Sequence, residues 1–162
     1  MNIGRLQLTQ GFEEKAIESF MQALSIYKLK LGDDHYNVAS TCENLALCFF
    51  KLKQYDNAIN YYQTALNIYN NHPHYTGNHP VIIHLHNTLG MAYSKKGSNA
   101  EALGHYFFAI EMLTNFEKKH VEMAFPTGGA GPAAWGNAEF NINFITEYYQ
   151  LYNNVASIYL KQ

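Results

Sequence analysis

Three stretches of the chain repeat one order of small and aromatic residues, and this periodicity restricts the fold more than any other feature. In each stretch an alanine is followed four residues later by an aromatic residue, and three residues after that by a second alanine. The columns are Ala16, Ala58 and Ala102, then Phe20, Tyr62 and Tyr106, then Ala23, Ala65 and Ala109. Their period is 42 residues and then 44 residues. Spacings of three and four put these residues on one helix face, and several columns that repeat together indicate stacked helical units.

A second helical pattern precedes each of these stretches. Twelve residues before the first alanine of each unit stands a small residue, which is Gly4, Ala46 or Gly90. In the central unit, Leu45 and Phe49 lie on the same helical stripe as the small residue. Small residues let two helix backbones approach, and larger side chains fill the space beside them. Each unit is therefore expected to be a helical hairpin.

The repeats and the interruption between them predict the domain organisation. The 162 residues are expected to form one domain, with repeats at about 1–36, 37–79 and 80–123, an insertion at 124–139 and a terminal half-repeat at 140–162. The four glycines and two prolines of Ala124–Gly136 exclude a continuous helix there. Because the chain begins inside one repeat and ends inside another, we expect either a fragment of a longer protein or open ends that another subunit covers.

These columns resemble the tetratricopeptide repeat, in which paired antiparallel helices carry small and aromatic residues in this order. The 42-residue spacing, the connector at Leu31–Ala39 and the Asn44-Leu45-Ala46 start are similar to the kinesin light chain branch of that family. The similarity covers about Ile3–Leu113, with Asn154–Lys161 as a last half-repeat. It implies an all-α, right-handed α-solenoid of about three and a half antiparallel helix pairs, whose function is to bind other proteins.

Composition adds limits on partners and compartment. The chain is 48% apolar and 15% aromatic, which is enough to bury a core. Its net charge of −2 gives no general attraction to nucleic acid or to an anionic membrane. No signal peptide and no apolar run long enough to span a bilayer is recognisable. Cys42 and Cys48 lie about 120° apart around one predicted helix and are not expected to pair, which fits a reducing, cytoplasmic location.

A cluster of histidines is the first candidate for chemistry. Five of them fall within fifteen residues: His72, His74, His79, His84 and His86. Two His-x-His pairs suggest zinc. However, His84 and His86 are about 200° apart on a helix and cannot bind one ion together. Structural or surface roles are favoured, and a histidine-dependent metal-binding regulator is kept only as a remote alternative. No metal and no cofactor are predicted.

Catalytic motifs are not recognisable elsewhere. Gly128-Gly129-Ala130-Gly131 lacks the Gly-Lys-Ser/Thr sequence and the preceding strand that a phosphate-binding loop requires. No Ser/His/Asp or Cys/His grouping stands in a catalytic context. The sequence therefore predicts a protein that is not an enzyme.

The first helix of each hairpin has a second face, about 150° from the one that packs into the hairpin. In the family that the chain resembles, this face lines the concave groove that binds partners. The predicted groove residues are Ser40, Glu43, Asn44, Leu47, Phe50 and Lys51, then His84, Asn87, Thr88, Met91, Ser94 and Lys95, then Asn153, Asn154, Ser157 and Lys161. This surface is rich in asparagine, basic at one edge and apolar in the middle.

Groove chemistry suggests the class of partner. Asparagine pairs with a peptide backbone through both its donor and its acceptor, and lysine favours acidic side chains or a C-terminal carboxylate. The leading hypothesis is a scaffold or adaptor that binds a protein or peptide segment, with acidic character favoured. The alternative is a structural subunit of a larger complex or homo-oligomer, which touches its neighbours through the open ends of the solenoid.

The only tryptophan lies in the insertion. Trp135 is a residue type that anchors contacts, and a solvated linker would not need it. One hypothesis is that it folds back onto the groove near Phe50 and Met91 as a lid, and the other is that it caps the base of its own loop.

Overall fold

A computed structural model describes residues 2–75, 79–124 and 138–160. Within these ranges all regular secondary structure is helical, and turns or irregular connectors join the helices. The helices are α1 (Asn2–Thr9), α2 (Glu13–Leu31), α3 (Tyr36–Lys51), α4 (Tyr55–Asn71), the short 3-10 helix η1 (Pro73–Tyr75), α5 (Pro80–Lys96), α6 (Asn99–Ala124) and α7 (Ala138–Tyr159).

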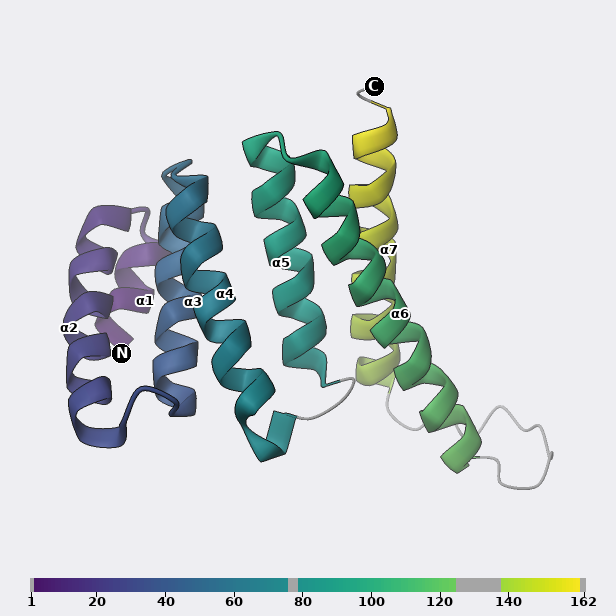
Figure 1. The fold of residues 1–162 in the computed structure, drawn as a ribbon, viewed down its shortest axis with the longest axis horizontal. Helices are drawn as coiled ribbons and strands as arrows, with labels where there is room; N and C mark the ends of the chain where they lie inside the picture. The colour runs from purple at the N-terminus through teal and green to yellow at the C-terminus, as the bar shows by residue number, and fades with distance from the viewer. Residues whose placement is uncertain (1, 76–78, 125–137, 161–162) are drawn as a thin grey trace.

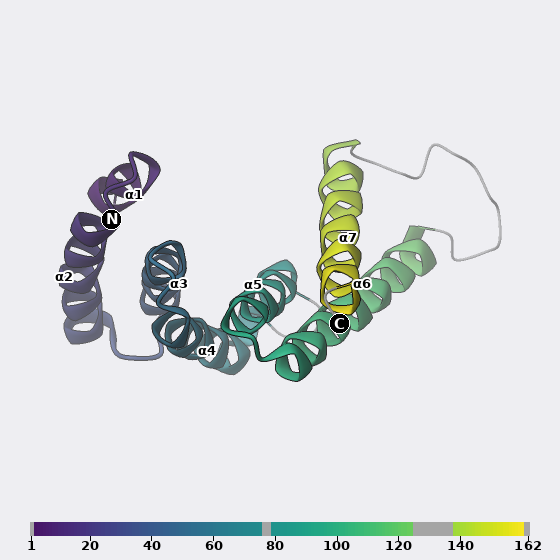
Figure 2. The ribbon, with the colours of Figure 1, turned by 90° about the horizontal axis from the view of Figure 1, so that it is seen from above.

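Successive helices pack as antiparallel pairs that form a curved row (Figure 1). The pairs are α1 with α2, α3 with α4 and α5 with α6, and α7 adds half of a further pair. Viewed from above, α1, α3, α5 and α7 lie on the inner side of the curve, and α2, α4 and α6 lie on the outer side (Figure 2). The prediction of an all-α solenoid of about three and a half helix pairs is confirmed.

The repeated columns form the contacts inside each hairpin. The first alanines of the three units are completely buried, and so are the second alanines of the central and third units. The aromatic residues between them, Phe20, Tyr62 and Tyr106, are at most 4% exposed. In the first and third units the ring packs where the partner helix carries its glycine. The ring of Phe20 lies against Gly4, and the ring of Tyr106 lies against Gly90.

Contacts between units continue the core along the row. Helix α3 is buried on two sides, because Leu45 and Cys48 pack with the first pair, whereas Val38, Ala39 and Cys42 pack toward α4 and α5. Such double burial is what a helix in the interior of a solenoid requires. At the other end, Leu151 and Ile158 join α7 to the same core. Cys42 and Cys48 are both buried free thiols, and burial raises the pKa of each to about 11.

Helix ends are set by local chemistry that is visible in the sequence. Helix α5 ends at Gly97, whose φ of 94° lies in the left-handed region that glycine tolerates. Helices α3 and α5 both begin after a histidine. The Nδ1 atom of His35 accepts from the Asn37 amide at 3.1 Å, and that of His79 accepts from the Val81 amide at 3.2 Å. Two connector histidines are thus N-caps.

Candidate binding surface on the concave side

The predicted groove residues are carried by the inner helices α3, α5 and α7, which line the concave side (Figure 2). Their side chains fall into three groups of exposure. Leu47, Lys51, His84, Lys95 and Asn153 are exposed, and Asn87 is buried at 7%. The other described members are partly buried: Ser40, Glu43, Asn44, Phe50, Thr88, Met91, Ser94, Asn154 and Ser157. Lys161 and Trp135, and with it the lid hypothesis, lie outside the described residues.

Two asparagines of this surface bind each other across neighbouring units. The Nδ2 atom of Asn154 on α7 donates to Oδ1 of Asn87 on α5 at 3.0 Å. An amide that is buried in this way needs such a partner, because an unpaired polar group costs about 1–3 kcal/mol. The pair therefore ties α7 to α5 and is used within the protein. Sequence reasoning missed this contact because 67 residues separate the two asparagines.

Several other polar side chains of the surface bond to their own helix. Asn44 Nδ2 donates to the Ser40 carbonyl at 2.6 Å, and Thr88 Oγ1 donates to the Leu85 carbonyl at 3.0 Å. Ser157 Oγ donates to a carbonyl of α7 one turn earlier, at 2.8 Å. Asn44 and Thr88 still have acceptor oxygens that these bonds do not use.

The lysines of the surface differ in their partners. Lys51 Nζ lies 3.5 Å from the Leu8 carbonyl oxygen and 3.9 Å from Glu13 Oε1, so it bridges α3 to the first helix pair. Lys95 is exposed on α5, and none of the hydrogen bonds or ion pairs in the described part of the chain involves it. Among the described lysines of this surface, Lys95 is therefore the one whose ammonium group is available to a ligand.

Glu43 has a role within the protein rather than in binding a ligand. Its carboxyl group interacts with the Tyr69 hydroxyl on α4, while its Oε1 atom is buried and makes no hydrogen bond to the described residues. Burial raises the pKa of the carboxyl group, and the hydrogen bond from Tyr69 lowers it to a smaller extent. Glu43 thus contributes to the contact between α3 and α4.

Apolar side chains lie among these polar groups. Leu47 is 39% exposed, whereas Phe50 and Met91 are partly buried against the core. The ring of Phe50 contacts Tyr55 edge-on, with 5.7 Å between centroids. Of these three side chains, Leu47 is therefore the most open to contact with a ligand.

The histidines are distributed over structural contacts. Around η1, Tyr75 contacts the rings of His72 and His79, with centroids 5.4 and 4.8 Å apart. On α5, His84 is exposed, whereas Nδ1 of His86 lies 3.0 Å from Nδ1 of His105 on α6. Within the described ranges, no three His, Cys, Asp or Glu side chains come close enough together to hold a metal ion.

Comparison with known proteins extends this description. Residues 1–71 match the tetratricopeptide repeat family. No curated protein matches the chain. In the part of the chain that the structure describes, no helix is both long and apolar enough to cross a membrane.

Two solved proteins share the fold along nearly the whole chain. BtubC (BKLC) from P. vanneervenii is 17% identical with a TM-score of 0.63, and the match covers 96% of this chain and 59% of that one. Kinesin light chain repeats from Podosopora anserina are also 17% identical, with a TM-score of 0.61 over 99% of this chain and 73% of that one. A second structure of the Podosopora repeats has a TM-score of 0.55, and the match covers 93% of its length. Residues 1–71 are thus tetratricopeptide repeats, and the chain as a whole has the fold of kinesin light chain-like tetratricopeptide repeat proteins.

Proposed function

We propose that the protein is a non-catalytic scaffold or adaptor that holds an acidic segment of a partner protein on the concave side of α3 and α5. The tetratricopeptide-repeat fold supports protein binding in general. The observation that carries the finer proposal is the coexistence of exposed Leu47 with Lys95, a lysine that has no hydrogen-bond or ion-pair partner among the described residues. A leucine side chain offers apolar contact, and an unpaired ammonium group offers a charge-assisted hydrogen bond to a carboxylate.

The neighbouring polar groups suit an extended chain. Asn44 and Thr88 each use one donor within their helix, and their acceptor oxygens stay available for backbone amides of a bound segment. Asn87 and Asn154 are not assigned to the ligand, because they bind each other. This assignment concentrates the proposed contact on the two central units.

Binding is expected to depend on Lys95 and on the acidity of the ligand. We would measure fluorescence polarisation of labelled peptides in which aspartate and glutamate alternate with leucine, and of peptides with lysine in the acidic positions. Lys95→Glu should weaken binding of the acidic peptide by about tenfold or more, because it replaces attraction by repulsion. Raising the salt concentration should weaken binding in the unaltered protein.

A matched control is Lys30→Glu, which makes the same charge change on the outer helix α2. It should leave the affinity for the acidic peptide nearly unchanged. If both variants lost the same affinity for the acidic peptide, the effect would come from the net charge of the protein and not from the position of Lys95. If the lysine-substituted peptides bound as well as the acidic ones, the acidic segment would be the wrong partner.

A second candidate function, assembly through the ends of the solenoid, is favoured by apolar side chains at both ends. On α1, Ile3 is 69% exposed and Leu6 is 58% exposed, and after α7 Leu160 is 87% exposed. We expect sedimentation equilibrium to show a mass above that of the monomer, and Leu6→Glu together with Leu160→Glu to reduce it. Phe107→Glu, on the outer helix α6, is the control that should leave the mass unchanged. A monomeric mass at every concentration would contradict this candidate.

We further propose that the protein works in the cytoplasm. Cys42 and Cys48 are buried free thiols that make no disulfide, which suits a reducing compartment.

A further inference from the structure

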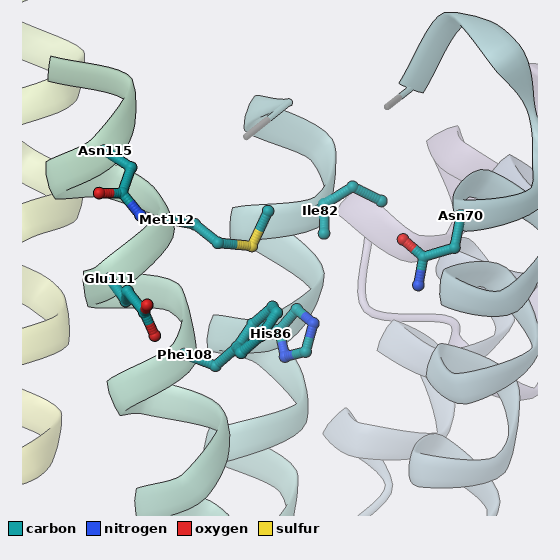
Figure 3. Close-up of a pocket in the computed structure, with 7 residues that line it drawn as sticks. All are labelled: Asn70, Ile82, His86, Phe108, Glu111, Met112 and Asn115. Carbon is teal, nitrogen blue, oxygen red and sulfur yellow. The ribbon is translucent and has the colours of Figure 1, made fainter. Parts of the chain in front are cut away.

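The outer side of the solenoid carries a depression between α4 and α6, with α5 beneath it (Figure 3). Its volume is about 340 Å³, at the small end of the range for ligand pockets. This location is opposite the concave side, because α4 and α6 are outer helices (Figure 2). A volume of this size suits one large side chain or a short segment rather than an extended peptide.

The inner wall of the depression is apolar. Ile82 on α5 and Met112 on α6 are buried in the core and face the depression (Figure 3). Phe108 on α6 is 47% exposed, and its ring lies against His86 with 4.4 Å between centroids. An alkyl or planar group placed here would cover apolar surface that the protein itself leaves open.

Burial and then the neighbouring His105 lower the pKa of His86 to about 4, so His86 brings no positive charge to this wall at neutral pH. Its Nδ1 atom is 3.0 Å from Nδ1 of His105, and a contact of that length requires one of the two nitrogens to lack a proton. The ring of Tyr93 stacks on that of His105, and the Tyr93 hydroxyl oxygen accepts from Gln63 Nε2 at 2.9 Å. The neutral pair is thus held in place by both neighbouring helices.

A single carboxylate remains as the charged group of the depression. Of the seven residues that line it, Glu111 alone carries a charge when His86 is neutral. Glu111 is exposed, and no ion pair in the described part of the chain involves its carboxylate. The amides of Asn70 on α4 and Asn115 on α6 complete the rim and add acceptor oxygens.

We propose that this depression binds an arginine side chain of a partner protein, separately from the concave surface. The alkyl stem would cover Ile82 and Met112, and the guanidinium group would pair with Glu111 while lying near the Phe108 ring. Arginine suits this arrangement better than lysine, because a planar guanidinium stacks on rings and donates several hydrogen bonds in fixed directions. The site would let one molecule hold an acidic segment on one side and a basic one on the other.

The test is an NMR titration of the ¹⁵N-labelled chain with N-acetyl-arginine methylamide, with the citrulline analogue as the neutral ligand of the same shape. We expect saturable shifts at amides of α5 and α6 around the depression, with a Kd on the order of millimolar to tens of millimolar. The citrulline analogue should bind at least about tenfold more weakly. N-acetyl-lysine methylamide should fall between the two.

Two variants on α6 make the test specific. Glu111→Gln removes the charge, keeps the shape and should weaken arginine binding by about tenfold, while Glu101→Gln, outside the depression, should not. The proposal would be overturned if no shifts appeared up to the solubility limit of the arginine ligand, or if the shifts appeared elsewhere on the chain. Equal affinities for the arginine and citrulline ligands would also overturn it. Unchanged binding to Glu111→Gln would overturn it as well.

Discussion

Gly90→Ala is expected to lower the free energy of unfolding by about 1–3 kcal/mol, although alanine favours a helix more than glycine does. A Cβ atom at position 90 would lie 2.5 and 2.6 Å from ring carbons of Tyr106, which is far inside van der Waals contact. Tyr106 is 2% exposed, so its ring cannot move aside without disturbing the core between α5 and α6. Urea denaturation followed by far-UV circular dichroism would measure the change.

Gly104→Ala is the matched control for this variant. Gly104 lies on α6, is exposed, and has no atom within 4 Å of the place its Cβ would take. Alanine there should raise the free energy of unfolding by about 0.5–1 kcal/mol, through helix propensity alone. Opposite signs at the two glycines are the expected result. If both variants gained stability, the close contact between Gly90 and Tyr106 would be wrong.

The second large effect is a loss of stability in mild acid that depends on His86. Burial, and then the neighbouring His105, lowers the pKa of His86 to about 4, and burial also lowers the pKa of His105. In the unfolded chain both imidazoles have ordinary pKa values near about 6.5 and take up protons first. The folded state therefore loses stability as pH falls from about 6.5 toward 4, by about 1–2 kcal/mol for His86 after a discount for the solvent screening of a partly exposed ring.

Urea denaturation at a series of pH values, compared between the protein and His86→Gln, would measure this contribution. The variant should be less stable at neutral pH and should lose less stability between about pH 6.5 and 4. The comparison with His86→Gln is necessary because Glu43 has the opposite effect on the pH dependence of stability. Burial raises the pKa of Glu43, so its contribution makes the folded state lose stability as pH rises. His74→Gln, at an exposed position beside α4, should follow the unaltered protein. Parallel curves for all three proteins would contradict the role of His86.

The contact between His86 and His105 also connects the acid sensitivity of the fold with the depression on the outer side. Protonation of both His86 and His105 would place two cations in contact at 3.0 Å, and it would add positive charge beside Glu111. Both changes act against a bound arginine side chain. The NMR titration is therefore best performed near neutral pH, where the pair carries no charge.

The helix pairs and their packing faces could be predicted from the amino-acid sequence alone. Small and aromatic residues recur with the same spacing in each unit. The ring of Tyr106 packs against the opposite helix where Gly90 leaves room for it. Such contacts form within one hairpin, where a short turn dictates which faces meet.

Which polar side chains are left for a partner depends on how the helix pairs pack against one another. Asn87 and Asn154 looked like free groove residues, yet the stacking of α7 on α5 brings them within 3.0 Å. Lys51 is bound to the preceding helix pair, whereas Lys95 is not. The relative rotation of neighbouring helix pairs sets these distances. The periodicity of residues within one helix gives no information about that rotation. The depression beside Glu111 depends on three helices at once, so no local pattern could predict it.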